Sequence, residues 1–344
     1  MTRPREGHML LLFLMLAVGA ATSTAQIDLS HDKYDIDSPH SLIGFSVDFM
    51  GLSKVEGRFT RYAGTVLYDE KDVTRSAVAL VIVVESINTA SAFRDNHLKT
   101  ADFFDAQKFP HILFISHRVA RQGEGFVLMG PLTLHGVTKE IAMACKLVHA
   151  RTTSDMWGNP RVGFEGRVML NRKDFGIGSS PRWEGKTETG AATIGDEVEI
   201  RLFISARILN YDKVSGGPSA FDTPLWKTFE EKGFEAMAAQ YREAAATPAA
   251  NAEEGQRREA AINRLGYKLL WRNRVKEALA VFEWNAAAFP QSANVYDSLA
   301  EAQARAGESA KALANYKRVL ELDAMSPNAL LMVRHLSAGR AAGN

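Results

Sequence analysis

The 344-residue chain has a single cysteine and almost no net charge. Cys145 cannot form an internal disulfide, and it lies in the alternating segment 141–148, which favours a buried structural thiol over a nucleophile. The 41 Lys and Arg residues balance 40 Asp and Glu residues, and there is no long basic run. The charge therefore gives no reason to expect nucleic acid or an anionic membrane as a partner.

Familiar catalytic and metal-binding signatures are also absent from the sequence. There is no Gly-x-Ser-x-Gly elbow, no phosphate-binding glycine loop and no Gly-x-Gly-x-x-Gly fingerprint. His40, His111 and His117 lack the spacing of zinc ligands, as does His135. We therefore interpret the chain as non-enzymatic and expect no metal and no covalent cofactor.

Long apolar runs are missing except near the N-terminus. Arg3 and Arg5 precede the apolar run 9–20, and small residues then lead to Ala25. This order is typical of a cleavable secretory signal, residues 1–25, with cleavage after Ala25. The run is shorter than the roughly 20 residues of a transmembrane helix, although an uncleaved anchor is the alternative. We expect a periplasmic or secreted protein with no integral membrane segment in the mature chain.

We expect a first domain over residues 26–210. From Tyr34 to about Asn210 it shows the period-two alternation of strands with one apolar face, as at Val198, Ile200 and Leu202. Strand-like runs fall near 33–37, 41–50, 55–68, 76–87, 111–119, 125–133, 137–150, 161–171 and 196–208. Eight or nine antiparallel strands at this spacing predict one barrel or sandwich.

One of these runs, residues 77–84, is apolar on both faces, so both faces must be covered. In a barrel of about eight strands, one face would look into an interior that is filled by side chains or holds a small ligand. The outer face could be covered by a helical insertion at 90–105. A sandwich core would satisfy the same pattern.

The segment 86–105 combines Arg94, Asp95 and His97 with three Phe residues. Helical neighbours three positions apart would place Arg94 and His97 on one face. They could form a catalytic cluster, contact the polar head of a ligand, or only anchor the insertion to the barrel. Phe103 and Phe104 could line the interior or plug the gap between helix and sheet.

After the predicted linker, residues 211–221, residues 222–344 are rich in Ala, Glu and Arg and indicate helices. Leu265 recurs as Leu299 and Phe282 recurs as Tyr316, each 34 positions later, which is the tetratricopeptide period. Residues 226–246 suggest one further helix, and 326–338 suggest a final one. We expect this all-α domain to bind a protein partner or a second copy, or merely to stabilise the protein.

An ordered set of motifs in the first half resembles the YceI-like polyisoprenoid-binding family over residues 32–208. The motifs fall at 34–41, 43–47, 57–59, 87–89, 94–98, 102–105, 109–111, 132–139, 171–177 and 195–198. Phe49 departs from the family, which usually has His at this position, so any polar role of that His is lost here.

The resemblance implies an antiparallel lipocalin-like β-barrel whose apolar interior holds an isoprenoid lipid, such as a quinone or a polyprenyl chain. It implies carriage or storage without chemistry. The alternative is a non-catalytic periplasmic scaffold with a filled barrel and a peptide-binding helical groove. The sequence does not show which face of each strand points inward. We take as ligand-binding candidates the alternating apolar residues of the predicted strands 41–50 and 76–87, together with residues of the helical insertion. They are Phe45, Val47, Phe49, Leu80, Ile82, Val84, Arg94, His97, Phe103 and Phe104.

Overall fold

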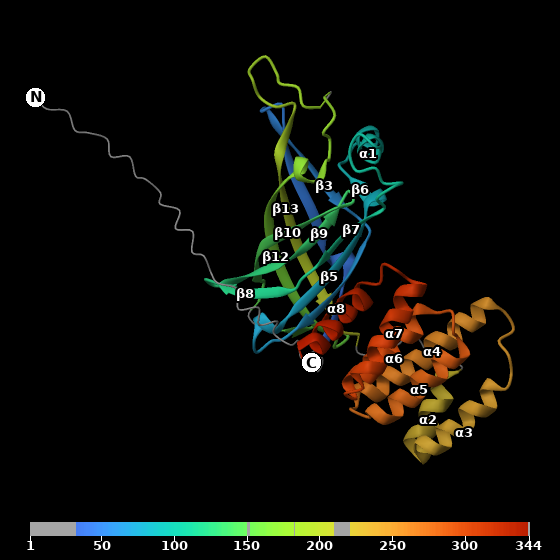
Figure 1. Ribbon diagram of the computed structural model, residues 1–344. Coiled ribbons are helices and arrows are strands. Elements are labelled where there is room, and N and C mark those ends of the chain that lie inside the picture. The colour runs from blue at the N-terminus through green and yellow to red at the C-terminus, as the bar shows by residue number, and fades with distance from the viewer. Residues whose placement is uncertain (1–31, 150–151, 182, 210–220, 343–344) are drawn as a thin grey trace, which may run out of the picture.

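The computed structural model describes residues 32–149, 152–181, 183–209 and 221–342. The predicted signal segment and nearly all of the predicted linker lie outside the described residues. An antiparallel β-barrel is followed by an all-α domain, which packs beside the lower part of the barrel in Figure 1.

The barrel is built from thirteen named strands. They are β1 (Asp32–Ile36), β2 (Leu42–Phe49), β3 (Ser53–Phe59), β4 (Tyr62–Tyr68), β5 (Ala77–Val83), β6 (Ile87–Asn88), β7 (His111–Ile115), β8 (Arg118–Gln122), β9 (Gly125–Leu134), β10 (Val137–Leu147), β11 (Thr153–Ser154), β12 (Pro160–Asn171) and β13 (Ile194–Arg207). Several of them are consecutive halves of one bent strand: β1 with β2, β3 with β4, β5 with β6, and β7 with β8. The predicted strands 55–68 and 111–119 are therefore each interrupted by a bend.

The sheet closes on itself because β13 is paired along both edges. One edge meets β12, from Arg207 opposite Arg161 to Glu197 opposite Asn171. The other edge meets β2 and then β1. Each remaining bent strand pairs with its neighbour, so eight antiparallel passes form a closed barrel. The closed barrel confirms one of the two architectures that the alternation allowed and excludes the sandwich.

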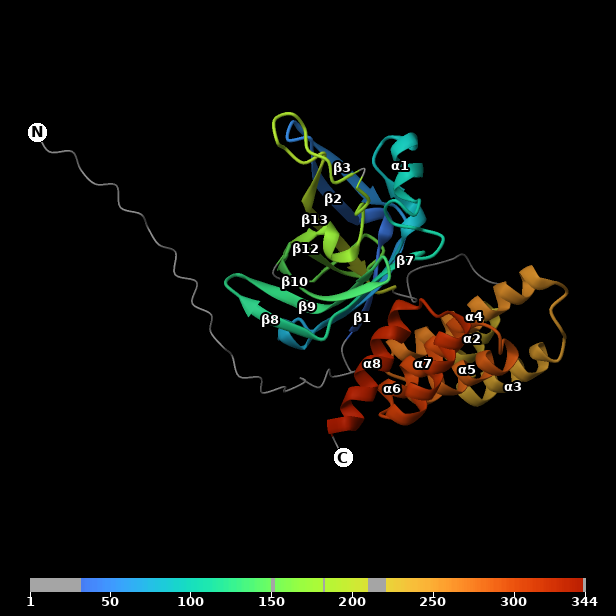
Figure 2. The same ribbon diagram turned by 45° about the horizontal axis from the view of Figure 1, so that its top comes forward.

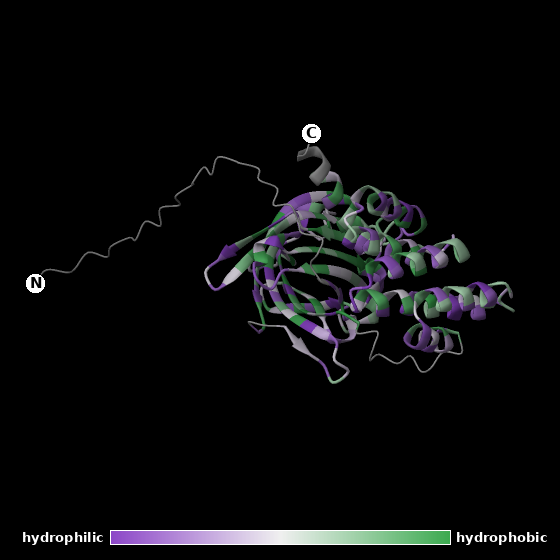
Figure 3. Cartoon of the chain, turned by 90° about the horizontal axis from the view of Figure 1, so that it is seen from below, coloured by the Kyte–Doolittle hydropathy of each residue, from purple (hydrophilic) through white to green (hydrophobic). Residues whose placement is uncertain are grey.

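Closure divides each strand into inward and outward residues, as the period-two pattern requires. Along β9, buried residues alternate strictly with partly buried ones. Figure 3, seen from below, shows hydrophobic and hydrophilic residues interspersed along the strands. The inward set forms one large hydrophobic cluster inside the barrel.

The outer face of β5 is covered by the helical domain, which corrects the expectation that the insertion covers it. Ala77 and Ala79 of β5 form a buried cluster with Leu331 and Met332 of the last helix, α8 (Pro327–Ala342). The helix of the insertion, α1 (Ala92–Leu98), is short and lies at the far end of the barrel (Figures 1 and 2). Two alanines on β5 leave room for a helix to approach the sheet closely.

The C-terminal domain consists of antiparallel helices that pack on their neighbours in the chain. They are α2 (Asp222–Lys232), α3 (Phe234–Ala245), α4 (Ala252–Trp271), α5 (Val275–Ala288), α6 (Ala293–Arg305), α7 (Ser309–Leu322) and α8. The single helix expected at 226–246 is two helices, because Gly233 between them adopts a φ of 85° that breaks the helix.

Small residues in the 34-residue pattern stand where helices approach closely. A Cβ added to Gly266 would lie 2.4 Å from the ring of Phe282, so α4 and α5 can pack at this distance only with glycine there. The equivalent Ala300 is fully buried. This packing agrees with a repeat, but the tetratricopeptide assignment itself stays a prediction.

A buried ion network joins the barrel to the helices. The Lys33 ammonium of β1 lies 2.8 Å from Glu301 and 3.4 Å from Asp297, both on α6. The Tyr267 hydroxyl donates to Glu301 at 3.0 Å, and Arg305 lies 3.1 Å from it. Burial alone would raise the pKa of Glu301, but the charges of Lys33 and Arg305 outweigh it and lower the pKa to about 2. Lys33 of the barrel thus forms ion pairs with α6 of the helical domain.

We expect the variant Lys33→Met to destabilise the protein strongly, because it leaves buried carboxylates at the junction without their cation. Removing one partner of a buried pair costs about 3 kcal/mol of unfolding free energy. Urea denaturation measures this loss. The control Lys54→Met breaks the exposed pair of Lys54 with Asp48, 3.6 Å apart, and should cost less than about 1 kcal/mol. Equal losses for the two variants would contradict this role of Lys33.

The same network predicts a pH dependence. The lowered pKa of Glu301 means that its ionised form stabilises the fold fully above the ordinary glutamate pKa of 4.5, and that this contribution disappears as the pH falls to about 2. The difference in unfolding free energy between the wild type and Glu301→Gln should therefore shrink across that interval. Other carboxylates titrate in both proteins and cancel. A difference that stays constant down to pH 2 would refute the assignment.

Candidate functional site

The candidate site is an apolar cavity of about 230 Å³ inside the barrel. An apolar cavity of about 150 Å³ stays free of water and can bind benzene, so this one has room for part of an apolar ligand. Its lining extends from Val73 and Val119 at the lower end to Phe103 and Ile177 at the upper end. Aliphatic and aromatic side chains dominate the lining, among them Ile43, Phe45, Val47, Phe59, Val66, Leu80, Ile82, Phe114, Phe126, Leu128, Leu132, Phe164, Phe175, Val198, Ile200 and Leu202.

Six of the ten residues predicted from the sequence line this cavity: Phe45, Val47, Leu80, Ile82, Phe103 and Phe104. The strand pairing decides which face points inward, and this was open at the level of the sequence. On β13 the inward residues are Val198, Ile200 and Leu202, and Val47 lies opposite Val198 in the register.

The other four predicted residues lie outside the cavity lining. Phe49 is the last residue of β2 and is 39% exposed. Val84 is buried in the 3₁₀ turn Val84–Ser86, where β5 ends and the chain bends. Arg94 and His97 of α1 are engaged with the protein itself.

Arg94 and its neighbour Asp95 anchor α1 through Thr89. The Arg94 guanidinium donates to the Thr89 hydroxyl at 2.8 Å and to the Thr89 carbonyl at 2.7 Å. The buried Asp95 carboxylate accepts from the Thr89 backbone N–H at 2.8 Å and from its hydroxyl at 2.6 Å. The polar side chains of Arg94 and Asp95 therefore find their hydrogen-bond partners within the insertion. These bonds hold α1 to the segment that contains Thr89.

His97 belongs to an aromatic group that closes the upper end of the barrel. Its Nε2 lies 2.8 Å from the Asp102 carboxylate. Its ring centroid lies 5.2 Å from that of Phe103 and 5.1 Å from that of Trp183. Phe103 also lines the cavity, so one residue serves both roles that the sequence had presented as alternatives. We call α1 with residues 99–110 the first lid segment, residues 176–181 and 183–193 the second lid segment, and the two together the lid.

Arg172 is a site residue that sequence reasoning missed. It is buried beside the cavity and donates to the carbonyls of Ile177, Gly178 and Gly195 at 2.8, 2.7 and 3.0 Å. It also donates to the Asp196 carboxylate at 2.9 Å. The guanidinium thereby fixes both ends of the second lid segment. The sequence signal was an arginine at the end of a strand, inside the 171–177 motif.

Several aromatic lining residues were also missed, although their alternation on strands could have indicated them. Phe114, Phe126 and Phe164 point inward from β7, β9 and β12. Cys145 of β10 lines the cavity as well, and burial raises the pKa of its thiol to about 12. A thiol with so high a pKa is a poor nucleophile at neutral pH.

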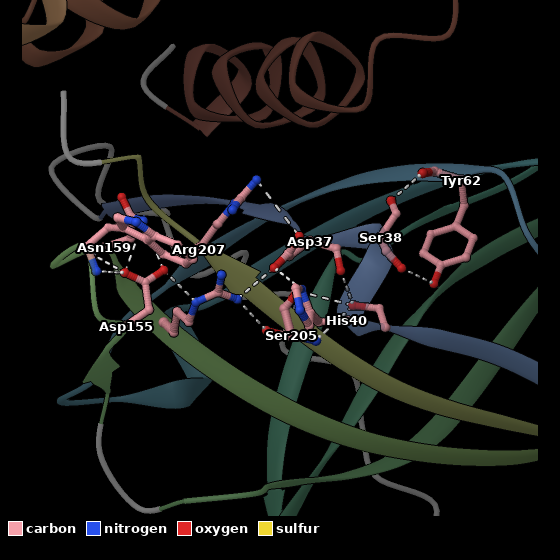
Figure 4. A network of polar contacts seen from close by, with 11 residues as sticks. Asp37, Ser38, His40, Tyr62, Asp155, Asn159, Ser205 and Arg207 are labelled. Carbon is pink, nitrogen blue, oxygen red and sulfur yellow. Dashed lines mark hydrogen bonds and ion pairs between the residues drawn. The ribbon is translucent and has the colours of Figure 1, made fainter. Parts of the chain in front are cut away.

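At the lower end, a polar network fastens the closing strands together (Figure 4). Arg161 of β12 donates to the carboxylates of Asp37 and Asp155, which Figure 4 labels, at 2.7 and 2.9 Å. His40 lies 2.8 Å from Asp37, whose backbone N–H donates to the Ser205 carbonyl at 2.8 Å. Burial raises the pKa of Asp37, but the hydrogen bonds from Arg161 and His40 outweigh it and lower the pKa. The residues of the 34–41 motif that belong to this network therefore have a structural role, which is to link β1 and β2 to β12 and β13.

A second cavity, of about 260 Å³, lies at the junction between barrel and helices. Its polar lining includes Lys33, Asp35, Glu301 and Arg305, most of which belong to the junction network. Within the described ranges, no group of three or more His, Cys, Asp or Glu side chains is placed to hold a metal ion. In the same part of the chain, no helix has both the length and the apolarity to cross a bilayer.

The fold and the cavity together define a closed antiparallel barrel with an apolar interior. A model of the YceI-like domain matches residues 34–206, and the chain belongs to the YceI-like family. A UPF0312 protein of Vibrio vulnificus is 38% identical over 167 residues, which cover 48% of this chain and 85% of the relative. A UPF0312 protein of Pseudomonas aeruginosa is 36% identical over 190 residues, 55% of this chain and 93% of the relative.

Among solved structures, one similar chain is a polyisoprenoid-binding domain from Saccharophagus degradans that is implicated in plant cell wall breakdown. It is 16% identical, with a TM-score of 0.39, over 51% of this chain and 98% of that chain. The family model covers the barrel, residues 34–206.

We expect Arg172→Met to destabilise the barrel by about 3 kcal/mol, because several buried carbonyls lose their donor. Limited proteolysis should cut the second lid segment faster in this variant, and urea denaturation measures the loss of stability. The neighbouring Lys173, which is half-exposed and pairs with Asp196 at 3.0 Å, supplies the control. Lys173→Met should cost less than about 1 kcal/mol, and a similar loss in both variants would argue against the anchoring role of Arg172.

Proposed function

We propose that the barrel binds the hydrocarbon chain of an isoprenoid lipid, such as a quinone or a polyprenyl lipid, and carries or stores it without chemistry. The observation that supports this proposal is the cavity of about 230 Å³ with its almost wholly apolar lining. Each methylene that leaves water for such a lining contributes about 0.8 kcal/mol. A chain of several isoprene units would therefore bind tightly without ion pairs.

The polar residues near the cavity fit binding better than catalysis. Arg94, Asp95 and Arg172 are each occupied by structural hydrogen bonds. Cys145 faces the cavity as a protonated thiol at neutral pH. A general acid or base must reach a reacting atom of the substrate, and the three charged groups are directed at the protein instead. The bound lipid would be the only cofactor-like component of this proposal.

We also propose that the protein acts after export, since the first 25 residues have the order of a secretory signal. A lipid with a long apolar tail cannot cross an aqueous compartment unaided. An exported protein that binds the tail would carry the lipid through that compartment. Docking of a protein partner or of a second copy through the helical domain stays a prediction. The faces of α6 and α8 that pack on the barrel are already covered.

The test is organic extraction of the protein purified from a bacterial periplasm, followed by mass spectrometry. We expect a quinone or prenyl lipid in the wild type. Val198→Trp should fill part of the cavity and exclude several methylenes, which lowers lipid occupancy roughly tenfold or more.

The control is Phe203→Trp on the same strand, where the side chain faces outward and is 40% exposed. It should leave occupancy unchanged. Wild-type protein that never yields a lipid, or a Val198→Trp variant that retains as much as the control, would contradict the proposal. Circular dichroism establishes that both variants fold.

A further inference from the structure

Two large hydrophobic side chains project into solvent at the lid end of the barrel. Leu52, in the turn between β2 and β3, is 84% exposed, and Phe93, on α1, is 87% exposed. Figures 1 and 2 both place the β2–β3 turn and α1 at the same end of the barrel. Burying these side chains would be favourable, and nothing within the described residues covers them.

The two side chains stand on connected parts of one rim. The Met50 backbone N–H donates to the Thr193 carbonyl at 3.1 Å, which ties the β2–β3 turn to the second lid segment. Ten residues earlier in that segment, Trp183 packs on His97 of α1 and on Phe103. The rim therefore runs without a break from the Leu52 turn through the lid to the helix that carries Phe93.

This rim also lies directly above the apolar cavity. Phe103 and Ile177 belong to the lid and line the cavity. The inner surface of the lid is thus in contact with the proposed lipid site, while its outer edge presents Leu52 and Phe93. An apolar ligand that enters or leaves between the lid and the barrel would pass this edge.

Charges at the rim are balanced. Lys54 pairs with Asp48 at 3.6 Å, and Lys99 pairs with Glu85 at 3.3 Å. Two further lysines also lie beside carboxylates, Lys139 beside Asp174 and Lys173 beside Asp196. Because these four lysines already have acidic partners, they offer little free positive charge to anionic headgroups.

We propose that this rim docks on the surface of a lipid bilayer, with Leu52 and Phe93 inserted as its two apolar anchors, and that lipid is exchanged at the lid end. The inference rests on the proposed lipid-binding function. Two inserted side chains give a weak and reversible attachment, as a carrier needs. The neutral rim makes the docking independent of anionic lipids.

The experiment is sedimentation of the exported protein with phosphatidylcholine vesicles, with and without one third phosphatidylglycerol. We expect binding to both kinds of vesicle with similar affinity. Each of Leu52→Ser and Phe93→Ser should lower the partition roughly tenfold, and the double variant roughly a hundredfold. Both positions are exposed, so melting temperatures should stay close to that of the wild type.

The matched control is the double variant Met156→Ser and Trp157→Ser. Both residues are exposed, Met156 to 87%, and they precede β12 at the end of the barrel away from the lid. This variant should bind vesicles as the wild type does. Equal losses in the two double variants, binding only in the presence of phosphatidylglycerol, or no binding at all would overturn the docking proposal.

Lipid extraction separates this proposal from the function on which it rests. Protein that yields a bound lipid but does not sediment with vesicles would refute the docking alone, and would direct attention to a protein that accepts the lipid at the rim. Protein that sediments through Leu52 and Phe93 but never yields a lipid would contradict the carrier function.

Discussion

The closure of the barrel through β13 is the constraint on which the rest of the structure depends. This strand pairs with β12 along one edge and with β2 and β1 along the other. Closure leaves no free sheet edge and forces every strand to have one inward face. The Asp37 network fastens the same strands where β1 turns into β2. Without this pairing there would be no enclosed interior and hence no site.

The helical domain completes the barrel from outside. An isolated barrel would expose Leu67, Ala77 and Ala79 to water, and α8 together with its neighbours buries them. Lys33 adds an ion pair to this apolar contact. A buried pair contributes more to a defined orientation than to net stability, because removing its charges from water is costly. The two domains therefore form one docked unit.

The lid shows how polar residues can serve an apolar site. Arg94, Asp95 and Arg172 make hydrogen bonds that hold lid segments in place. Their donors and acceptors are directed at backbone groups, which leaves hydrophobic side chains such as Phe103 to face the cavity. Strong, directional bonds are suited to positioning, whereas a hydrocarbon ligand needs only area and shape.

The local pattern of the sequence determined the strands, the helices and the apolar character of residues 77–84, because side-chain periodicity follows directly from backbone geometry. It also identified a polar cluster in the insertion. Phe45, Val47 and Phe49 share one face of β2, and the sequence did not show that the cavity ends before Phe49 at the end of the strand. It also did not show that Arg94 would bond to Thr89.

Periodicity alone did not decide between barrel and sandwich, since both bury alternate residues and differ in whether β13 returns to β1 and β2. The family resemblance predicted the barrel, and the tertiary structure confirms it. It also decided that α8, more than 240 residues beyond β5 in the chain, covers that strand. Contacts over such separations depend on the whole fold, and periodicity carries no information about them. The sequence therefore determined which faces of the strands and helices are apolar. The fold determined which elements cover those faces.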